Sequence, residues 1–504
     1  MPSMTRLQSL VASVPTLQDR SLSLPNELLL QIFGYVVDLD GDPPSVSKIL
    51  LEPSLDLTRH EHQPLKTLSL VCQRWRLILL PNVFRYARVT LSRVPRWVCL
   101  CTSLAEEITR TGHRDGSQHT RNLIDSIYSR TETSPSRAIT SNDPNNPMNM
   151  EYIDDDDSDL LSLSKTYVHW LPSIRGEVET FMKFVREKDL HTEIKSLVLQ
   201  TDQELTPHPT AVEQTVIVQQ VNIIWKTFLN TLRLGRLVIA APPSTMAALT
   251  STRDSLESWT FEMPLHYLCF SCKAWKKREV MEKLSFSPPS SPDSSPSTKR
   301  PKRVQARPHN IRPWTQMIYN EGTMLPGYAH YEWNFNCPPL ILPILLNFIH
   351  RECNYIRHDL TCDRSPNITS LTYISNFPFA EHVKSISLEL TQFKNLRDVT
   401  IKFAEMDYLD DENSRLGRGQ TSDVWKEWED SYKNIVKHFL KSARAGVSVE
   451  CLDTVHTRLL EDVDKIMKEN SLVEQGPMAG RSFLQAEIEG VGSERKGRWV
   501  RKDI

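Results

Sequence analysis

Five short apolar segments with one shared pattern constrain the fold of this chain more than any other feature of its sequence. Each segment places large apolar residues at its first, fourth and sixth positions. The five sets are Ile194/Leu197/Leu199, Leu234/Leu237/Ile239, Leu265/Leu268/Phe270, Ile368/Leu371/Tyr373 and Leu396/Val399/Ile401. Residues two positions apart lie on the same face of a β-strand, so each segment predicts a strand with one face in a core.

The spacing between these segments indicates repeated strand–helix units. Leu237 and Leu268 are 31 positions apart, and Leu371 and Val399 are 28 positions apart. Units of that length suit a leucine-rich-repeat-like α/β solenoid, whose repeats run roughly 20 to 29 residues. No unit carries the Asn or Cys of that repeat at the expected position, so we predict a degenerate solenoid. The alternative is a generic α/β domain with a parallel sheet.

Helical spacing of apolar residues between and after these strands completes the predicted body. The predicted strands cover residues 194–200, 235–241, 264–271, 367–375 and 396–403. The predicted helices cover residues 179–191, 223–232, 244–251, 338–353, 380–393, 425–439 and 452–466. The repeat-like body therefore divides into a first part at 166–284 and a second part at 311–410, followed by C-terminal helices at 421–470.

Other segments carry too few apolar residues to form a core. Much of the excess of 32 prolines over 16 glycines lies in them. Such composition cannot offset the entropy of the unfolded chain, so we predict that they are flexible or disordered. They are a tail at 1–20, a loop at 38–64, a low-complexity insertion at 102–165, a Pro/Ser/basic linker at 285–310 and a C-terminal tail at 471–504.

Composition excludes several classes of protein. The formal net charge is −2, so no global field favours nucleic acid or an anionic membrane. No apolar run is long enough to span a bilayer, and the first residues do not resemble a secretory signal. The 9 scattered cysteines fit a reducing compartment, which predicts a cytoplasmic or nuclear protein.

Two apolar helices are predicted near the N-terminus. The first, LPNELLLQIFGYV at residues 24–36, carries a wide apolar stripe that something must cover. The second lies within residues 65–89, where Leu68, Val71 and Trp75 recur at helical spacing. We expect Pro81 to end this second helix.

Together these two segments resemble an F-box over residues 21–95, with the loop at 38–64 inserted between its halves. The matching elements are Leu24-Pro25, Ile32-Phe33, Val71-Cys72, Trp75-Arg76, Pro81 and Val83-Phe84-Arg85. More loosely, WTQMIYNEGTMLPGYAHYEW, SLTYISNFPFAEHV and NLRDVTIKFA are similar to the body of a broad group of filamentous-fungal F-box proteins. The resemblance implies a small all-α domain of three helices ahead of the α/β body.

The resemblance also implies a function. F-box proteins bind the Skp adaptor of an SCF (Skp–cullin–F-box) ubiquitin ligase and through it a cullin scaffold. This chain would then be a non-catalytic adaptor subunit that presents an unknown protein substrate on its body. By resemblance the adaptor-binding residues are Leu24, Pro25, Leu28, Leu29, Ile32, Phe33, Val71, Trp75, Val83 and Phe84. The alternatives are that these residues form only the domain's own core, or that the protein is a Skp-binding or nuclear scaffold outside a ligase.

No motif in the sequence nominates a catalytic group, a cofactor or a metal site. Cys269-x-x-Cys272 has the spacing of half a zinc site. Two further ligands from Cys353, His358 or Cys362 match no zinc-finger spacing. His60-Glu61-His62 lacks the spacing of H-E-x-x-H and is expected to be a solvated loop segment.

A basic cluster in the predicted linker is a candidate nuclear-import signal. It consists of Lys299, Arg300, Lys302 and Arg303. The alternative is a solvated cluster that keeps the linker soluble. Ser287, Ser291 and Ser295 each precede a proline just upstream, and phosphates there would place negative charge beside the cluster.

Overall fold

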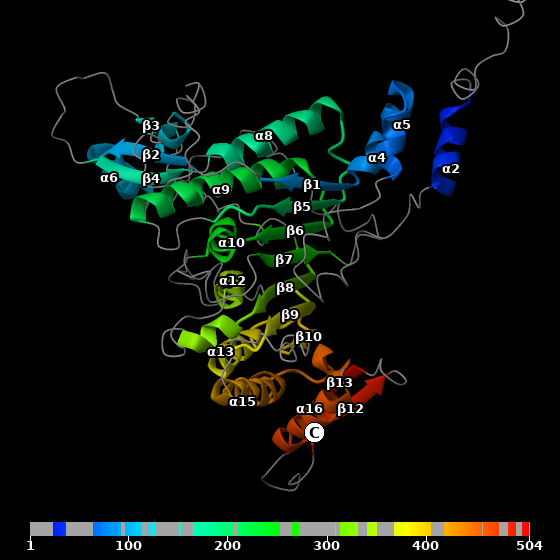
Figure 1. The fold of residues 1–504 in the computed structure, drawn as a ribbon, viewed down its shortest axis with the longest axis vertical. Helices are drawn as coiled ribbons and strands as arrows, with labels where there is room; N and C mark the ends of the chain where they lie inside the picture. Colours follow the sequence, from blue (N-terminus) through cyan, green and yellow to red (C-terminus); the bar gives the residue numbers. More distant parts are fainter. Residues whose placement is uncertain are drawn as a thin grey trace, which may run out of the picture.

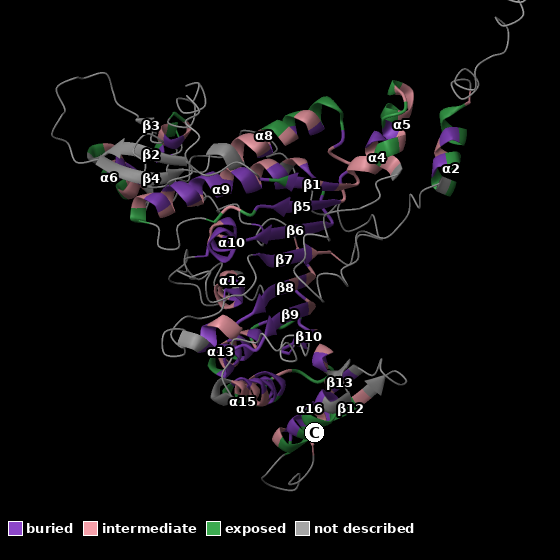
Figure 2. Ribbon diagram, viewed as in Figure 1, coloured by how far each residue is buried: buried purple, intermediate pink, exposed green. Residues whose placement is uncertain are grey.

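A computed structural model shows a mixed α/β protein built around one ten-stranded sheet (Figure 1). The structure describes residues 24–36, 64–91, 96–112, 119–120, 122–126, 151–152, 165–170, 172–204, 210–252, 265–272, 308, 313–330, 340–349, 367–404, 418–455, 457–472, 482–489 and 496–502. Figure 2 shows that the central strands are buried along most of their length, whereas exposed positions concentrate on the helices at the two ends.

The strands of the large sheet lie nearly in chain order. From one edge to the other they are β1 (Tyr86–Thr90), β5 (Ser196–Gln200), β6 (Arg236–Ala241), β7 (His266–Ser271), β8 (Gln316–Thr323), β9 (Ser370–Asn376), β10 (Asp398–Lys402), β11 (Ser448–Cys451), β13 (Lys496–Arg501) and β12 (Leu484–Glu489). The trio β1, β5 and β6 is parallel, and so is the run from β8 to β11. A separate small sheet has the order β3 (Glu151–Tyr152), β2 (Arg96–Cys101) and β4 (Lys165–Trp170).

Helices precede the sheet and connect its strands, and α10, α12 and α13 line one side of it in Figure 1. The α-helices are α2 (Asn26–Val36), α4 (Pro64–Ser69), α5 (Gln73–Phe84), α6 (Thr102–Gly112), α8 (Pro172–Glu187), α9 (Ala211–Thr231), α10 (Pro243–Thr250), α12 (Ile341–Ile349), α13 (Ala380–Leu390), α15 (Arg418–Asn434) and α16 (Thr457–Asn470). Two 3₁₀ segments, η9 (Leu325–His330) and η11 (Leu452–Val455), and a π-helical segment, η10 (Ile435–Leu440), also lie in the described part of the chain.

The five predicted strands are confirmed as β5, β6, β7, β9 and β10. Their pattern sets the register in the parallel pairs β5–β6 and β9–β10, where residues at the fourth position lie directly opposite one another. Leu197 pairs with Leu237, and Leu371 pairs with Val399. In the antiparallel pair β6–β7 the fourth residue of one strand lies opposite the sixth residue of the other. These side chains are buried in one continuous core beneath the helices. The repeated pattern therefore forms a continuous apolar row on the helix-covered face of the sheet.

The sheet departs from an all-parallel stack at β7, which runs antiparallel to both β6 and β8. Its first residue, His266, lies opposite Ala241, the last residue of β6. Strand β7 therefore begins at the same end of the strands at which β6 finishes.

The longest helix, α9, is fixed at both its beginning and its middle. Thr210 and Glu213 form a reciprocal capping box, in which each side chain accepts from the other residue's backbone N–H. Farther along, the indole Nε1 of Trp225 donates to the carbonyl of Leu249 at 2.7 Å. This buried bond joins α9 to α10 beneath the sheet.

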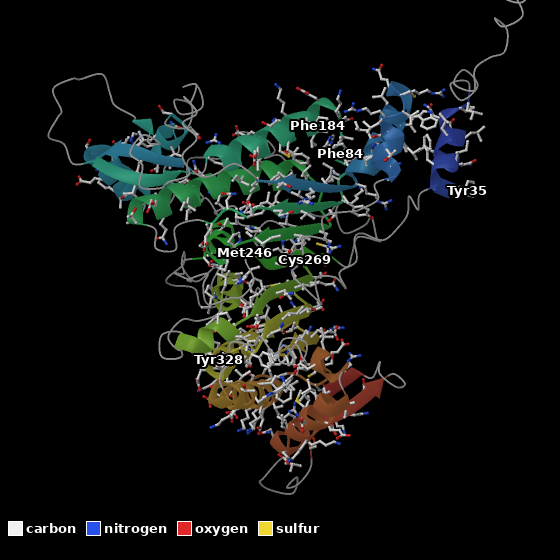
Figure 3. All side chains as sticks on the ribbon, in the orientation of Figure 1. Tyr35, Phe84, Phe184, Met246, Cys269 and Tyr328 are labelled. Atoms are coloured by element: carbon white, nitrogen blue, oxygen red, sulfur yellow. The ribbon has the colours of Figure 1, made fainter. Side chains whose placement is uncertain are left out.

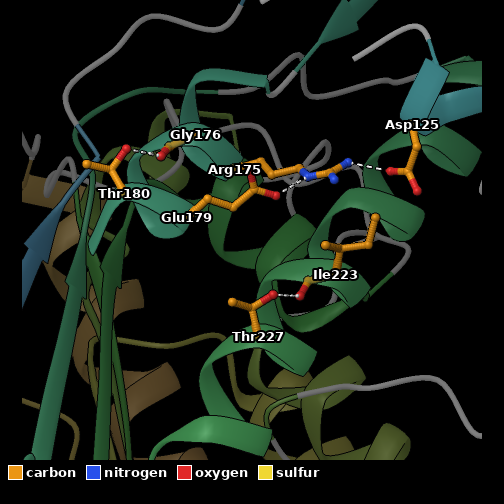
Figure 4. A network of polar contacts seen from close by, with 7 residues as sticks. All are labelled: Asp125, Arg175, Gly176, Glu179, Thr180, Ile223 and Thr227. Atoms are coloured by element: carbon orange, nitrogen blue, oxygen red, sulfur yellow. Dashed lines mark hydrogen bonds and ion pairs between the residues drawn. The ribbon is translucent and has the colours of Figure 1, made fainter. Parts of the chain in front are cut away.

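The prediction of a low-complexity insertion at 102–165 is wrong for its first residues. They form α6, whose Ala105 and Ile108 pack with Ile124 against Val216 of α9. The Arg175 guanidinium on α8 reinforces this region by binding Asp125 at 2.6 Å and Glu179 at 2.8 Å (Figure 4). The apolar residues of α6 are few, but they lie on one face, so composition alone did not reveal the helix.

The prediction of a C-terminal tail at 471–504 is also wrong. Strands β12 and β13 form a hairpin that extends the sheet beyond β11. Trp499 of β13 is buried, and its Nε1 donates to Asp464 of α16 at 3.4 Å. The charged residues of these strands obscure the alternation of apolar and polar positions. A sheet with one solvated face needs apolar residues on its other face only, so few apolar residues are present to show the pattern.

Among the described residues, no helix combines the length and the apolar composition needed to cross a bilayer.

Candidate functional site

The three N-terminal helices α2, α4 and α5 pack on a small core of their own, separate from the core under the sheet. Leu29 and Phe33 of α2 and Leu79 of α5 are its fully buried members. Partly buried apolar residues close around them; these are Leu24, Leu65, Leu68, Trp75, Ile78 and Val83. So few buried side chains give a domain of limited stability, which leaves little room for further losses.

Helix α2 carries two apolar stripes, and only one of them faces this core. Leu29 and Phe33 point inward. Leu28 and Ile32, one position earlier in each turn, are 44% and 45% exposed. The exposed stripe continues to Pro25 and Tyr35. The Tyr35 side chain points away from the other helices in Figure 3. The structure therefore leaves large apolar side chains in water on the outer face of α2.

Polar contacts fix how α2 and α5 meet. The guanidinium of Arg74 donates to the Asn26 side chain, with Nη2–Oδ1 at 2.8 Å, and also to the Leu24 carbonyl. These bonds hold the first turn of α2 against the start of α5. The sulfur of Cys72 caps α5 by accepting from the Trp75 backbone N–H. Both contacts use residues of the matched motif for local structure.

The second helix differs from the sequence prediction at its end, because Pro81 lies inside α5 and the helix continues to Phe84. Only Arg85 then separates α5 from β1. The Phe84 ring packs on Phe184 of α8 with a centroid distance of 5.1 Å (Figure 3). Phe84 thus contacts the body, and it joins the N-terminal helices to the sheet.

The predicted adaptor-binding residues fall into three groups. Pro25, Leu28, Ile32 and Val71 are exposed. Leu29 and Phe33 are buried between the helices, where no partner can reach them while the helices stay packed. Leu24, Trp75, Val83 and Phe84 are half-buried. The exposed group is thus the part of the prediction that is available to a partner.

Three further large apolar side chains of these N-terminal helices and their turns are exposed, and none of them belongs to the matched motif. Tyr35 extends the stripe of Leu28 and Ile32 by one more turn, so helical spacing alone is enough to identify it. Leu70 and Leu77 are 71% and 61% exposed. Their signal in the sequence is weak, because Leu77 lies in an apolar run with the buried Leu79 and Leu80, and Leu70 lies in another with the half-buried Leu68.

Leu70 and Leu77 line a cleft between α5 and α8, with a volume of about 500 Å³. The other lining residues are Ser69, Cys72, Gln73, Arg76, Leu80, Phe184 and Lys188. Leu80 forms a buried part of the wall. The cleft therefore combines apolar walls with two cations and lies on the side of α5 that faces the body.

Strongly shifted ionisable groups lie inside the body instead. Burial raises the pKa of Glu321 to about 7, and it lowers the pKa of His266 to about 3. The Tyr373 hydroxyl donates to Glu321, while the Tyr319 hydroxyl lies 2.8 Å from His266 Nδ1. Both Glu321 and His266 are fully buried, so these groups belong to the interior.

Several predicted features have no counterpart that can be described. The candidate import signal Lys299, Arg300, Lys302 and Arg303 lies outside the described residues. So do Ser287, Ser291, Ser295, Cys353, His358, Cys362 and the segment His60–His62. Cys269 and Cys272 are free thiols. Within the described ranges, no group of three or more His, Cys, Asp or Glu side chains is placed to hold a metal ion.

Comparisons of the chain with protein families, with curated proteins and with solved structures found no match.

Proposed function

We propose that this protein is the substrate-recognition subunit of an SCF ubiquitin ligase and docks the Skp adaptor through α2 and the turn before α5. The observation that carries the proposal is the exposed stripe of Leu28 and Ile32 beside a closed helical core. Its second support is the resemblance of residues 21–95 to an F-box. Val71, also exposed, lies in the turn between α4 and α5.

The physical argument starts from the division of labour along α2. Its inner stripe already satisfies the helical core, so the outer stripe adds nothing to folding. Large apolar side chains at positions i and i+4 are the usual anchors of a helix in a partner's groove. Their transfer out of water on binding stabilises a complex by about 1.5 to 3 kcal/mol for each fully buried side chain.

The proposed protein carries out no chemistry of its own. It holds a target protein near a ubiquitin-loaded enzyme and thereby raises the effective concentration of the two reactants. In this proposal the body is a degenerate leucine-rich-repeat-like solenoid. The nearly sequential strand order favours this interpretation, and the reversed strand β7 is its main departure.

Co-precipitation with the Skp adaptor tests the proposal. The variant Leu28→Asp/Ile32→Asp places two carboxylates in the docking face and is expected to lose the adaptor, because an unpaired charge in a desolvated contact is strongly unfavourable. A matched control is Leu388→Asp/Leu472→Asp, which alters leucines on the body that are 48% and 47% exposed. The control is expected to retain the adaptor.

Circular dichroism must show that both variants keep the helical content of the wild type. Failure of the folded wild-type protein to bind the adaptor would overturn the proposal. Adaptor binding without a cullin in the precipitate would instead indicate a Skp-binding scaffold outside a ligase.

A further inference from the structure

We propose that the cleft between α5 and α8 binds a linear peptide segment of a partner protein in which large apolar side chains are flanked by carboxylates. As a peptide site the cleft is independent of the proposed function. As the place where a ligase substrate is recognised, it rests on that function.

The apolar half of the argument comes from Leu70 and Leu77. Both are large apolar residues, both are more exposed than Leu28 or Ile32, and both line the same cleft. Phe184 and Leu80 extend the apolar wall between them and α8. A volume of about 500 Å³ is within the range of sites that enclose several side chains of a ligand.

Charge identifies the occupant more narrowly. Two exposed cations, Arg76 and Lys188, line the cleft, and no carboxylate is among its lining residues. Neither side chain forms an ion pair or hydrogen bond with any residue in the described part of the chain. The surrounding stretch from Pro64 to Leu91 contains five cations and no Asp or Glu. A peptide with apolar groups alone would leave Arg76 and Lys188 without opposite charges nearby, whereas flanking carboxylates would complement the two cations.

The two faces of α5 keep this site separate from the exposed stripe of α2, and the cleft meets the proposed adaptor face only at the turn before α5, where Leu70 and Cys72 flank Val71. Trp75, Ile78 and Leu79 contact the α2 side, in the helical core. Arg76 and Leu77 face the cleft on the other side. A substrate peptide in the cleft would therefore lie next to the adaptor without overlapping the exposed stripe of α2.

Fluorescence anisotropy on the purified full chain, measured both without and with the Skp adaptor, tests the proposal. The probe is a panel of fluorescein-labelled ten-residue peptides, each with two leucines, isoleucines or phenylalanines flanked by glutamates. Matched panels carry lysines or serines at the glutamate positions. We expect acidic peptides to bind at least tenfold more tightly than their lysine counterparts, with an affinity that falls as salt is raised.

The variant Arg76→Glu/Lys188→Glu is expected to reverse that preference, and Leu77→Ser to weaken binding about tenfold. These positions are exposed, so the substitutions leave the fold intact. The matched control is Arg110→Glu/Lys465→Glu, which reverses one exposed arginine and one exposed lysine away from the cleft and should change nothing. All three variants are expected to retain the adaptor, so failure here is distinct from failure of the docking face.

Five results would each overturn the proposal. One is the absence of saturable binding by any acidic peptide of the panel, and another is equal binding of lysine peptides. Displacement of the peptide by a dT₂₀ oligonucleotide would assign the cations to a phosphate backbone. Loss of the adaptor in Leu77→Ser would assign the cleft to the adaptor. A gain in peptide affinity above tenfold on deletion of residues 40–60 would assign the cleft to the chain's own insertion.

Discussion

Phe33 of α2 meets Trp75 of α5 edge to face, with ring centroids 4.8 Å apart and ring planes at 68°. The two residues are 42 positions apart in the chain, so this contact joins segments that are distant in sequence. An edge-to-face pair contributes about 0.5 to 1.5 kcal/mol beyond the area that it buries. The contact therefore helps to hold α2 against α5.

Substitutions in the two stripes of α2 are expected to have very different effects on stability. Phe33→Ala leaves a cavity beside Trp75 and Leu79 and should lower the free energy of unfolding of the three helices by about 3 to 5 kcal/mol. Leu28→Ala removes an exposed side chain and should change it by less than about 0.5 kcal/mol. Native-state hydrogen exchange of the α2 amides measures both. Equal loss of protection in the two variants would contradict this assignment of the inner and outer stripes.

Asp453 is predicted to hold the C-terminal part of the body together. Its buried carboxylate accepts from Trp428 Nε1 at 2.9 Å, from the Tyr432 hydroxyl at 2.6 Å and from the backbone N–H groups of Phe403 and Ala404. Asp453→Ala leaves all four donors unsatisfied and should cost at least about 3 kcal/mol in urea denaturation. Asp462→Ala, at an exposed position of α16, is the control. A loss below about 1 kcal/mol for Asp453→Ala would show that the donors find other partners.

Glu321 predicts a pH dependence of stability with a definite sign. Burial raises its pKa from 4.5 to about 7, so the folded state holds a proton that the unfolded state has released. Stability should therefore fall as pH rises from about 4.5 to 7 and stay level above that range. Relative to Glu321→Gln, the loss should reach roughly 3 kcal/mol.

Urea denaturation of both proteins at pH 4, 6 and 8 tests this prediction. Comparison with Glu321→Gln cancels the contribution of His266, which is common to both proteins. That contribution has the opposite slope, because the pKa of His266 is lowered by burial and its charging in the unfolded state favours unfolding in acid. A difference between the two proteins that does not change with pH would disprove an elevated pKa for Glu321.

Gly497 is predicted to be the residue that allows Trp499 to pack. A Cβ at this position would overlap the Trp499 ring. Gly497→Ala should therefore displace the indole and reduce stability by about 1 to 3 kcal/mol. Gly446→Ala serves for comparison, since its Cβ meets open space and only its φ of +81° opposes the change, at about 1 kcal/mol. Thermal unfolding distinguishes the two, and a larger effect at Gly446 would count against the packing argument.

The sequence was sufficient for the strands whose apolar pattern is local. It was not sufficient for β8, in which Glu321 occupies a buried position that would normally be apolar. Nor was it sufficient for β11, which has only four residues and depends on β10 and β13 for its edges. Strands of this kind are determined by the strands beside them. The local sequence pattern carries no information about those neighbouring strands.

The same limit applies to the proposed docking face of α2. Helical spacing identifies both stripes of α2, but Leu28 and Leu29 are chemically alike, as are Ile32 and Phe33. Which stripe turns inward is decided by Trp75 and Leu79, more than forty positions later in the chain. Motif resemblance selected both stripes together, whereas the packing of α5 divides them into a core and a surface.

The single residue between α5 and β1 has a mechanical consequence. The carbonyl of Arg85 accepts from the backbone N–H groups of Lys195 and Ser196, so this joint is pinned to β5 as well. A joint of one residue that is held by these hydrogen bonds has little freedom to bend. A protein bound to α2 would therefore keep a fixed orientation relative to the sheet. The extent of such a complex would depend on the length of the sheet, with no contribution from a flexible linker.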